Sequence, residues 1–77
     1  MLAKHIGELR VKLELNQGEF GRLFAVSAMA VSRWERGGAV RSDALIQMAL
    51  LAHRSGLDAW QFLNAVGLSR KDARNAI

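Results

Sequence analysis

The chain contains no cysteine, no proline and no tyrosine, and aromatic residues make up only 6% of its 77 residues. Without cysteine, neither a disulfide bond nor a cysteine-ligated zinc site can form, and nothing indicates an oxidising compartment. Long apolar runs are also missing. Residues 1–15 carry charged side chains throughout, so they match neither a signal peptide nor a membrane span. We expect a cytoplasmic protein with no membrane contact.

Residue patterns that support catalysis are missing as well. His5 and His53 fall in separate predicted helices with no clustered carboxylates, so each is most simply a helix residue and not a metal ligand. No Gly-x-Ser-x-Gly elbow, no glycine-rich phosphate loop and no pair of acids occurs. We therefore expect no catalytic residue, no metal and no cofactor, and hence no enzymatic activity.

The chain does have an excess of positive charge on a small, half-apolar sequence. Lysine and arginine total 11 against 7 aspartate and glutamate residues, which gives a net charge of +4. A length of 77 residues predicts one domain, close to the lower limit for a self-sufficient core. The charge is compatible with an anionic polymer as partner, but also with mere solubility. Charge alone leaves the function open.

Residues 16–38 have the spacing of a helix-turn-helix, and its first helix has a defined start. Asn16 is a candidate N-cap, with Glu19 three residues later as in a capping box. The apolar residues that follow at one-turn spacing are Phe20, Leu23 and Phe24. This pattern predicts a short amphipathic helix.

A second short helix follows after about one turn's worth of residues. Ser27 is its candidate N-cap, and Val31 and Trp34 form its buried stripe up to a stop at Gly37. Gly21, midway along the first helix, has no side chain and so allows the second helix to approach. The residues left on the outer face are Ala28, Met29, Ser32 and Arg33. A helix-turn-helix places its second helix in the DNA major groove, so these are candidate base-contacting residues.

This segment resembles the XRE family of regulators, which includes the phage Cro and repressor DNA-binding domains. The similarity covers roughly residues 6–62. Its most specific parts are Leu15-Asn16-Gln17 and Val31-Ser32-Arg33-Trp34-Glu35-Arg36-Gly37. The resemblance implies an all-α fold, a five-helix lambda-repressor-like DNA-binding domain, with double-stranded DNA as its partner.

The resemblance also implies roles for individual residues. Gln17 matches a residue that holds a DNA phosphate at a helix N-terminus, and Arg36 matches one that lies near the DNA backbone. The expected phosphate contacts are Gln17, Ser27, Arg36 and Arg41; the expected base contacts are Ala28, Met29, Ser32 and Arg33. Of these, Arg33 can bond bidentately to guanine, and the apolar residues can contact little beyond a thymine methyl.

The sequence departs from the family pattern at two places. The turn position that is usually glycine is Ala25, and a positive φ there costs about 1 kcal/mol relative to glycine. The loop 39–42 has no proline, which weakens the expected phosphate contact of Arg41. The other basic residues near the motif, interpreted as solvated helix faces, are Arg10, Lys12 and Arg22, of which Arg22 could also reach a phosphate.

The rest of the chain is predicted to be helical. Residues 2–13 form an amphipathic helix, and residues 42–56 carry two apolar stripes, one with Leu45 and Met48 and the other with Ile46 and Leu50, which suggests burial on several sides. A further helix starts near residue 58. We expect a single domain over residues 1–67. Residues 68–77 fit a short helix, a basic arm or, preferably, a frayed tail.

The last predicted helix has two apolar faces. One consists of Leu57, Trp60 and Leu63, and the other of Ala59, Phe62 and Val66. One small domain cannot easily cover both, so we assign the second face to a dimer partner. The alternative is that Phe62 folds back on the first helix. The family resemblance also implies dimers that read two half-sites about one helical turn apart.

The sequence therefore predicts a homodimeric transcriptional regulator, preferably a repressor, that binds a near-palindromic operator. Activation stays open. No small-molecule ligand is expected, so a protein partner is one possible means of control. The alternative is a helix-turn-helix fold used for protein binding, as in an antitoxin-like subunit or an adaptor that docks on another regulator through Phe62 and Trp60. The apolar run Ala28-Met29-Ala30 would suit this function.

Overall fold

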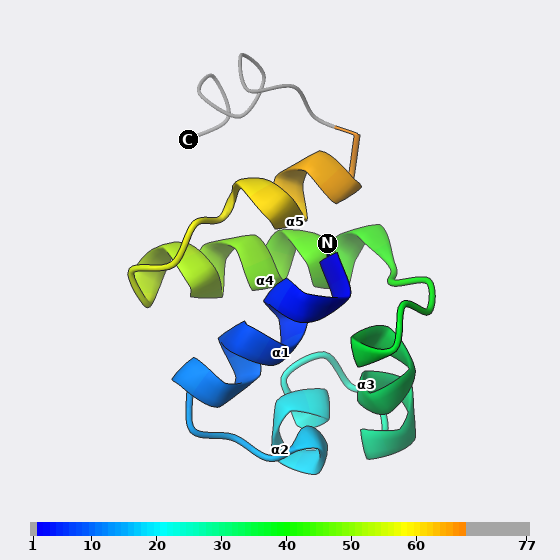
Figure 1. Cartoon of the computed structure of the whole chain (residues 1–77). Coiled ribbons are helices and arrows are strands. Elements are labelled where there is room, and N and C mark those ends of the chain that lie inside the picture. Colours follow the sequence, from blue (N-terminus) through cyan, green and yellow to red (C-terminus); the bar gives the residue numbers. More distant parts are fainter. Residues whose placement is uncertain (1, 68–77) are drawn as a thin grey trace. The chain divides into compact units, whose positions relative to one another are not determined.

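The computed structural model describes residues 2–67, and all regular secondary structure in that part of the chain is helical (Figure 1). The helices are α1 (Leu2–Lys12), α2 (Gln17–Arg22), α3 (Ala28–Glu35), α4 (Ser42–Arg54) and α5 (Trp60–Ala65). The prediction of an all-α chain with five helices is confirmed for these residues. None of these helices combines the length and the apolar character that crossing a membrane requires.

The chain divides into two compact units, Met1–Val40 and Arg41–Ile77, which are described separately. The first contains α1, α2 and α3, and the second contains α4 and α5. The expected single domain over residues 1–67 stays a prediction. The predicted tail, residues 68–77, lies outside the described residues.

The first unit is organised around α3, which packs against both α1 and α2. Its buried apolar side chains are Ile6, Leu9, Phe20, Phe24, Val31 and Trp34. The ring centroid of Phe24 lies 5.0 Å from that of Phe20 and 5.8 Å from that of Trp34, both edge to face, an arrangement that aromatic pairs favour. The assignment of Trp34 to the core is confirmed. Leu23, expected on the apolar stripe, is instead 47% exposed.

Both predicted caps of the helix-turn-helix are present. The Asn16 side-chain oxygen accepts from the Glu19 backbone N–H at 2.8 Å, and the Glu19 carboxylate accepts from the Asn16 N–H at 3.0 Å. The Ser27 hydroxyl accepts from the Ala30 backbone N–H at 3.2 Å. These bonds satisfy donors that a helix start otherwise leaves unpaired, so the two helices begin at fixed residues.

The turn between α2 and α3 passes directly over Gly21. A β-carbon added at Gly21 would lie 2.6 Å from the Val26 carbonyl oxygen and 3.1 Å from that of Ser27. Backbone atoms cannot move aside as a flexible side chain can. The predicted close approach at Gly21 is therefore confirmed, and it is the turn itself that comes close.

Left-handed residues end the helices of the first unit. Ala25 has a φ of 58° and Glu14 a φ of 59°, whereas α3 ends at a glycine, Gly37, with a φ of 97°. At each of these three ends, the residue after the left-handed one donates its N–H to the carbonyl five residues earlier, as from Val26 to Gly21 at 3.0 Å. Ala25 thus has the positive φ that the glycine of the family's turn pattern would allow, and Glu14 is a second left-handed residue, which no sequence pattern indicated.

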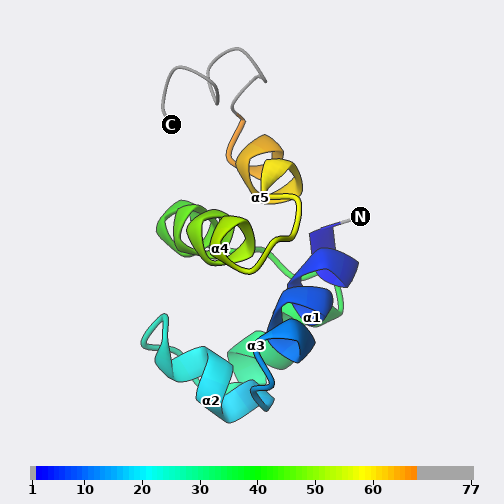
Figure 2. The ribbon, with the colours of Figure 1, turned by 90° about the vertical axis from the view of Figure 1, so that its left-hand side faces the viewer.

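The second unit consists of α4 and α5, which lie side by side in both views (Figures 1 and 2). α4 begins at Ser42, and Arg41 is its N-cap, although serine is the residue type that a sequence pattern would choose as the cap. Before α5, the Asp58 carboxylate accepts a hydrogen bond from the Trp60 backbone N–H at 2.9 Å. The buried apolar residues are Ala44, Leu45, Met48, Ala49, Ala52 and Phe62.

Two expectations about exposed and buried apolar residues in this unit are wrong. Phe62 is only 1% exposed, so it belongs to the core of the chain and cannot anchor an exposed interface patch with the half-buried Ala59 and Val66. Ile46 and Leu50, expected to be buried, are 45% and 53% exposed. A stripe pattern cannot say which of two apolar faces of a helix finds a neighbour, and here it is the face of Leu45 and Met48 that is buried.

We predict that Ala25→Gly stabilises the protein by about 0.5–1 kcal/mol, because glycine removes the strain of a left-handed alanine. Glycine also raises the conformational entropy of the unfolded chain, which offsets part of that gain. The check is urea unfolding followed by circular dichroism. Ala28→Gly is the control, because the same chemical change at a helical residue destabilises by up to about 1 kcal/mol. Equal destabilisation by both would contradict the prediction.

We also predict that Gly21→Ala destabilises by about 1–3 kcal/mol, because the added methyl group collides with two backbone carbonyls. Gly18→Ala in the same helix is the matched control. Its β-carbon would meet nothing closer than 3.5 Å, so higher helix propensity leaves stability unchanged or slightly raised. Similar unfolding midpoints for the two variants would show that the turn can relax.

Candidate nucleic-acid interface

The two faces of α3 differ in burial as the sequence predicts. Val31 and Trp34 are buried, while Ala28, Met29 and Arg33 are exposed and Ser32 is half-buried. Met29 is 63% exposed, and its sulfur lies 3.5 Å from a terminal guanidinium nitrogen of Arg33. The four candidate base-contacting residues thus include one cation and one hydroxyl group beside two apolar side chains.

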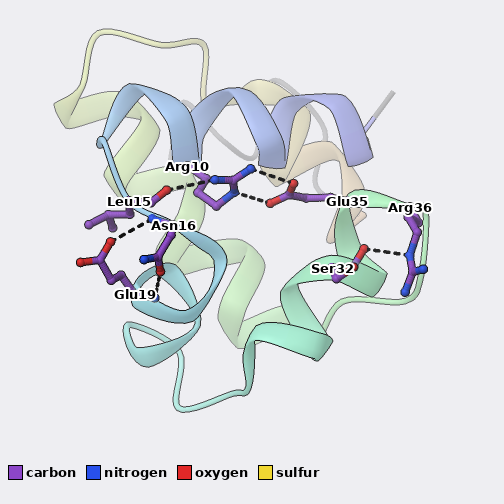
Figure 3. A network of polar contacts seen from close by, with 7 residues as sticks. All are labelled: Arg10, Leu15, Asn16, Glu19, Ser32, Glu35 and Arg36. Carbon is purple, nitrogen blue, oxygen red and sulfur yellow. Dashed lines mark hydrogen bonds and ion pairs between the residues drawn. The ribbon is translucent and has the colours of Figure 1, made fainter.

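Three of the four candidate phosphate contacts belong to the same unit as α3. Ser27 and Arg36 are exposed at the two ends of α3, and Gln17 is half-buried at the first residue of α2. The Arg36 Nε donates to the Ser32 carbonyl oxygen at 3.3 Å (Figure 3). That bond uses one of the five N–H donors of the guanidinium group. The other donors of this exposed side chain can bind an anion.

The electrostatics at the start of α2 are mixed. The capping box places the Glu19 carboxylate on the N-terminal turn of this helix, beside Gln17. A carboxylate there stabilises the helix but repels a second anion. A phosphate contact at this point would therefore depend on the Gln17 amide group more than on the end of the helix.

Arg41 does not join the other candidates. It lies in the second unit, exposed, with its Nε 3.3 Å from an Asp43 carboxylate oxygen. Both side chains are largely in solvent, where such a pair contributes little. The phosphate contact expected of Arg41 therefore stays a prediction.

Arg10, expected on a solvated helix face, instead forms a sheltered ion pair with Glu35, so that expectation is wrong. Its Nε donates to Glu35 at 2.6 Å, and a terminal nitrogen donates to the other Glu35 oxygen at 3.2 Å. The second terminal nitrogen donates to the Leu15 carbonyl oxygen at 3.0 Å (Figure 3). A β-carbon on Gly7 would lie 3.7 Å from a Glu35 carboxylate oxygen, an ordinary van der Waals distance, so the carboxylate lies beside α1. One guanidinium group therefore joins α1, the segment after it and the end of α3.

This ion pair is sheltered but not fully buried, with side-chain exposures of 21% for Arg10 and 16% for Glu35. The hydrogen bonds to Glu35 raise the pKa of Arg10 above its ordinary value, although partial burial acts in the opposite direction. Arg10 therefore stays charged at every pH at which the protein is studied. Arg10 and Glu35 are far apart in sequence, so no local pattern could have paired them. The only sequence feature that pointed to a role for Glu35 was its place in the Trp-Glu signature.

No group of three or more potential metal-ligating side chains occurs among residues 2–67. No protein-family model, no curated protein and no solved structure matches the chain. The case for a nucleic-acid interface therefore depends on the residues and geometry described above.

We predict that Arg10→Met destabilises the protein by about 1–3 kcal/mol, because it leaves the sheltered Glu35 carboxylate without its partner. Arg22→Met, at an exposed position of α2, is the control and should change stability by less than about 0.5 kcal/mol. Chemical denaturation of both variants is the measurement. An equal cost for the two would mean that the Arg10–Glu35 pair adds nothing to stability.

Proposed function

We propose that this protein is a sequence-specific DNA-binding transcriptional regulator that inserts α3 into the major groove. The observation that supports this best is the division of α3 into a buried apolar face and an exposed face that carries the cation Arg33, with a second exposed cation, Arg36, at the C-cap of the helix. A helix can enter the groove only if its outer face projects from the protein. The signature residues 31–37 lie on this helix and its end.

Arg33 is the residue proposed to read sequence. Its guanidinium group contacts the Met29 sulfur, a weak acceptor, so it can turn towards a base at little cost. A bidentate contact to guanine O6 and N7 contributes about 1–3 kcal/mol of discrimination. Ala28 and Met29 offer only apolar contacts, which suit a thymine methyl, and Ser32 offers a hydroxyl group.

Arg36 is proposed to bind the DNA backbone and not a base. It is the C-cap of α3, beyond the exposed face that would enter the groove. Gln17 is the first residue of α2 and Ser27 is the N-cap of α3. Both would contact phosphates at the N-terminal ends of the two motif helices, whereas Arg36 lies at the C-terminal end of α3. Binding would then combine one strong base contact with sequence-independent contacts.

The proposal extends to the biological role. A small basic domain with one strong base contact per copy needs a second copy to reach useful specificity, so we propose a homodimeric repressor at a near-palindromic site, acting in the cytoplasm. Repression needs only occupation of a promoter, which a domain of this size can provide.

A second candidate function is protein binding by the same helix. Met29 is largely exposed, and Leu23, on the turn that precedes α3, is exposed as well. One exposed apolar side chain on the candidate reading face and another on the turn before it suit a protein partner, as in an antitoxin-like subunit or an adaptor. The experiment below separates the two functions.

The deciding experiment is selection of binding sites from random-sequence DNA by the purified chain at near-physiological salt. Enrichment of a motif with a guanine in each of two symmetric half-sites supports the proposal. No enrichment, by a protein whose circular dichroism shows it folded, rejects sequence-specific binding in favour of the protein-binding function.

We predict different effects for the two arginines of this surface. Arg33→Ala should remove the preference at one base position, by about 1–3 kcal/mol, and Arg33→Lys should not restore it, because an ammonium group lacks the guanidinium fork. Arg36→Ala should weaken binding to all sequences alike and reduce the slope of log K against log salt by about one unit.

The measurements are titrations of the selected site and its single-base variants at several salt concentrations. Lys12→Ala removes an exposed cation from α1 and is the control for net charge. Unchanged base preference in Arg33→Ala would show that α3 is not the reading helix.

A further inference from the structure

The outward face of α4 has an unusual composition. Its exposed residues include two large apolar side chains, Ile46 and Leu50, between an acidic residue, Asp43, and a basic residue, Arg54. At about 100° per residue these four side chains fall within an arc of about 80°. They therefore form one stripe, opposite the buried side chains of Leu45 and Met48.

This stripe is complementary to itself when it is turned end for end. The midpoint of Asp43 and Arg54 falls between residues 48 and 49, and that of Ile46 and Leu50 falls at residue 48. A two-fold axis through this point would place each Asp43 beside an Arg54 of the other copy and each Ile46 beside a Leu50. A two-fold interface requires this kind of self-complementarity.

We propose that this face of α4 binds a second copy of the chain, with the two α4 helices antiparallel. Parallel helices are excluded by the same charges, because they would place Asp43 against Asp43 and Arg54 against Arg54. The proposal deepens the dimer named in the proposed function without depending on DNA binding. It also replaces the interface expected at Phe62, which is buried in the core.

The Arg41–Asp43 ion pair does not prevent this contact. Both side chains are largely exposed, so their pairing is weak and Asp43 can exchange Arg41 for a partner's arginine. The contact itself is small. A pair of helices of 13 residues buries less than the roughly 1,600 Å² of a standard interface, so the dimer should be weak and should weaken further with salt.

The test is charge exchange, followed by sedimentation equilibrium at low salt and without DNA. Asp43→Arg alone and Arg54→Asp alone each turn two attractive pairs into repulsive ones and should raise the dimer dissociation constant roughly tenfold. An equimolar mixture of the two variants should associate like the original protein, because both cross-copy pairs are again opposite in charge.

Matched controls on α1 are Glu8→Arg and Lys12→Asp, which change the net charge by the same amounts at exposed positions. Neither these variants nor their mixture should change association. A monomeric protein at concentrations up to about 1 mM, or a mixture of the α4 variants no better than each alone, would overturn the proposal. DNA binding by the monomer would be unaffected by that failure, so the two proposals can fail separately.

Leu50→Asp tests the apolar part of the stripe. We expect a folded monomer with a slightly lower melting temperature, because the side chain is about half in solvent and aspartate has a lower helix propensity than leucine. Unchanged association by this variant would overturn the proposal as well.

Discussion

The geometry of the first unit depends on the hydrogen bonds that Arg10 donates to Glu35. Glu35 is the last residue of α3, so the ion pair fixes that end of the helix against α1. The bond from Arg10 to the Leu15 carbonyl holds the segment that leads into α2. The outward face of α3 is thus set by a contact that is itself remote from the candidate base-contacting residues.

The other constraint is the tight turn between α2 and α3. Gly21 permits the turn to pass at van der Waals distance, and Ala25 adopts a left-handed conformation so that the chain can reverse there. Glycine is the residue type that the close approach at position 21 requires, whereas alanine is not the type that favours the left-handed conformation at position 25. The strain at Ala25 is affordable because the aromatic cluster around Phe24 and the Ser27 cap stabilise the same turn.

The two exposed helix faces carry different chemistry. The outward face of α3 has basic side chains and no acidic one, which suits a polyanion, whereas the face of α4 has one charge of each sign around an apolar centre. A surface with both signs gains nothing from uniformly negative DNA but can pair with its own copy. This contrast is why we propose DNA as the partner of α3 and a second chain as the partner of α4.

The sequence by itself determined the five helices, both motif caps, the core position of Trp34 and the left-handed Ala25, because capping, helical periodicity and turn chemistry act over a few neighbouring residues. Only the tertiary structure decided that Arg10 pairs with Glu35, that Phe62 is buried and that Ile46 and Leu50 are exposed. An apolar stripe shows that a helix has a face to bury. Which of two such faces is covered, and which distant charges meet, depends on packing between segments far apart in the chain, which no local pattern contains.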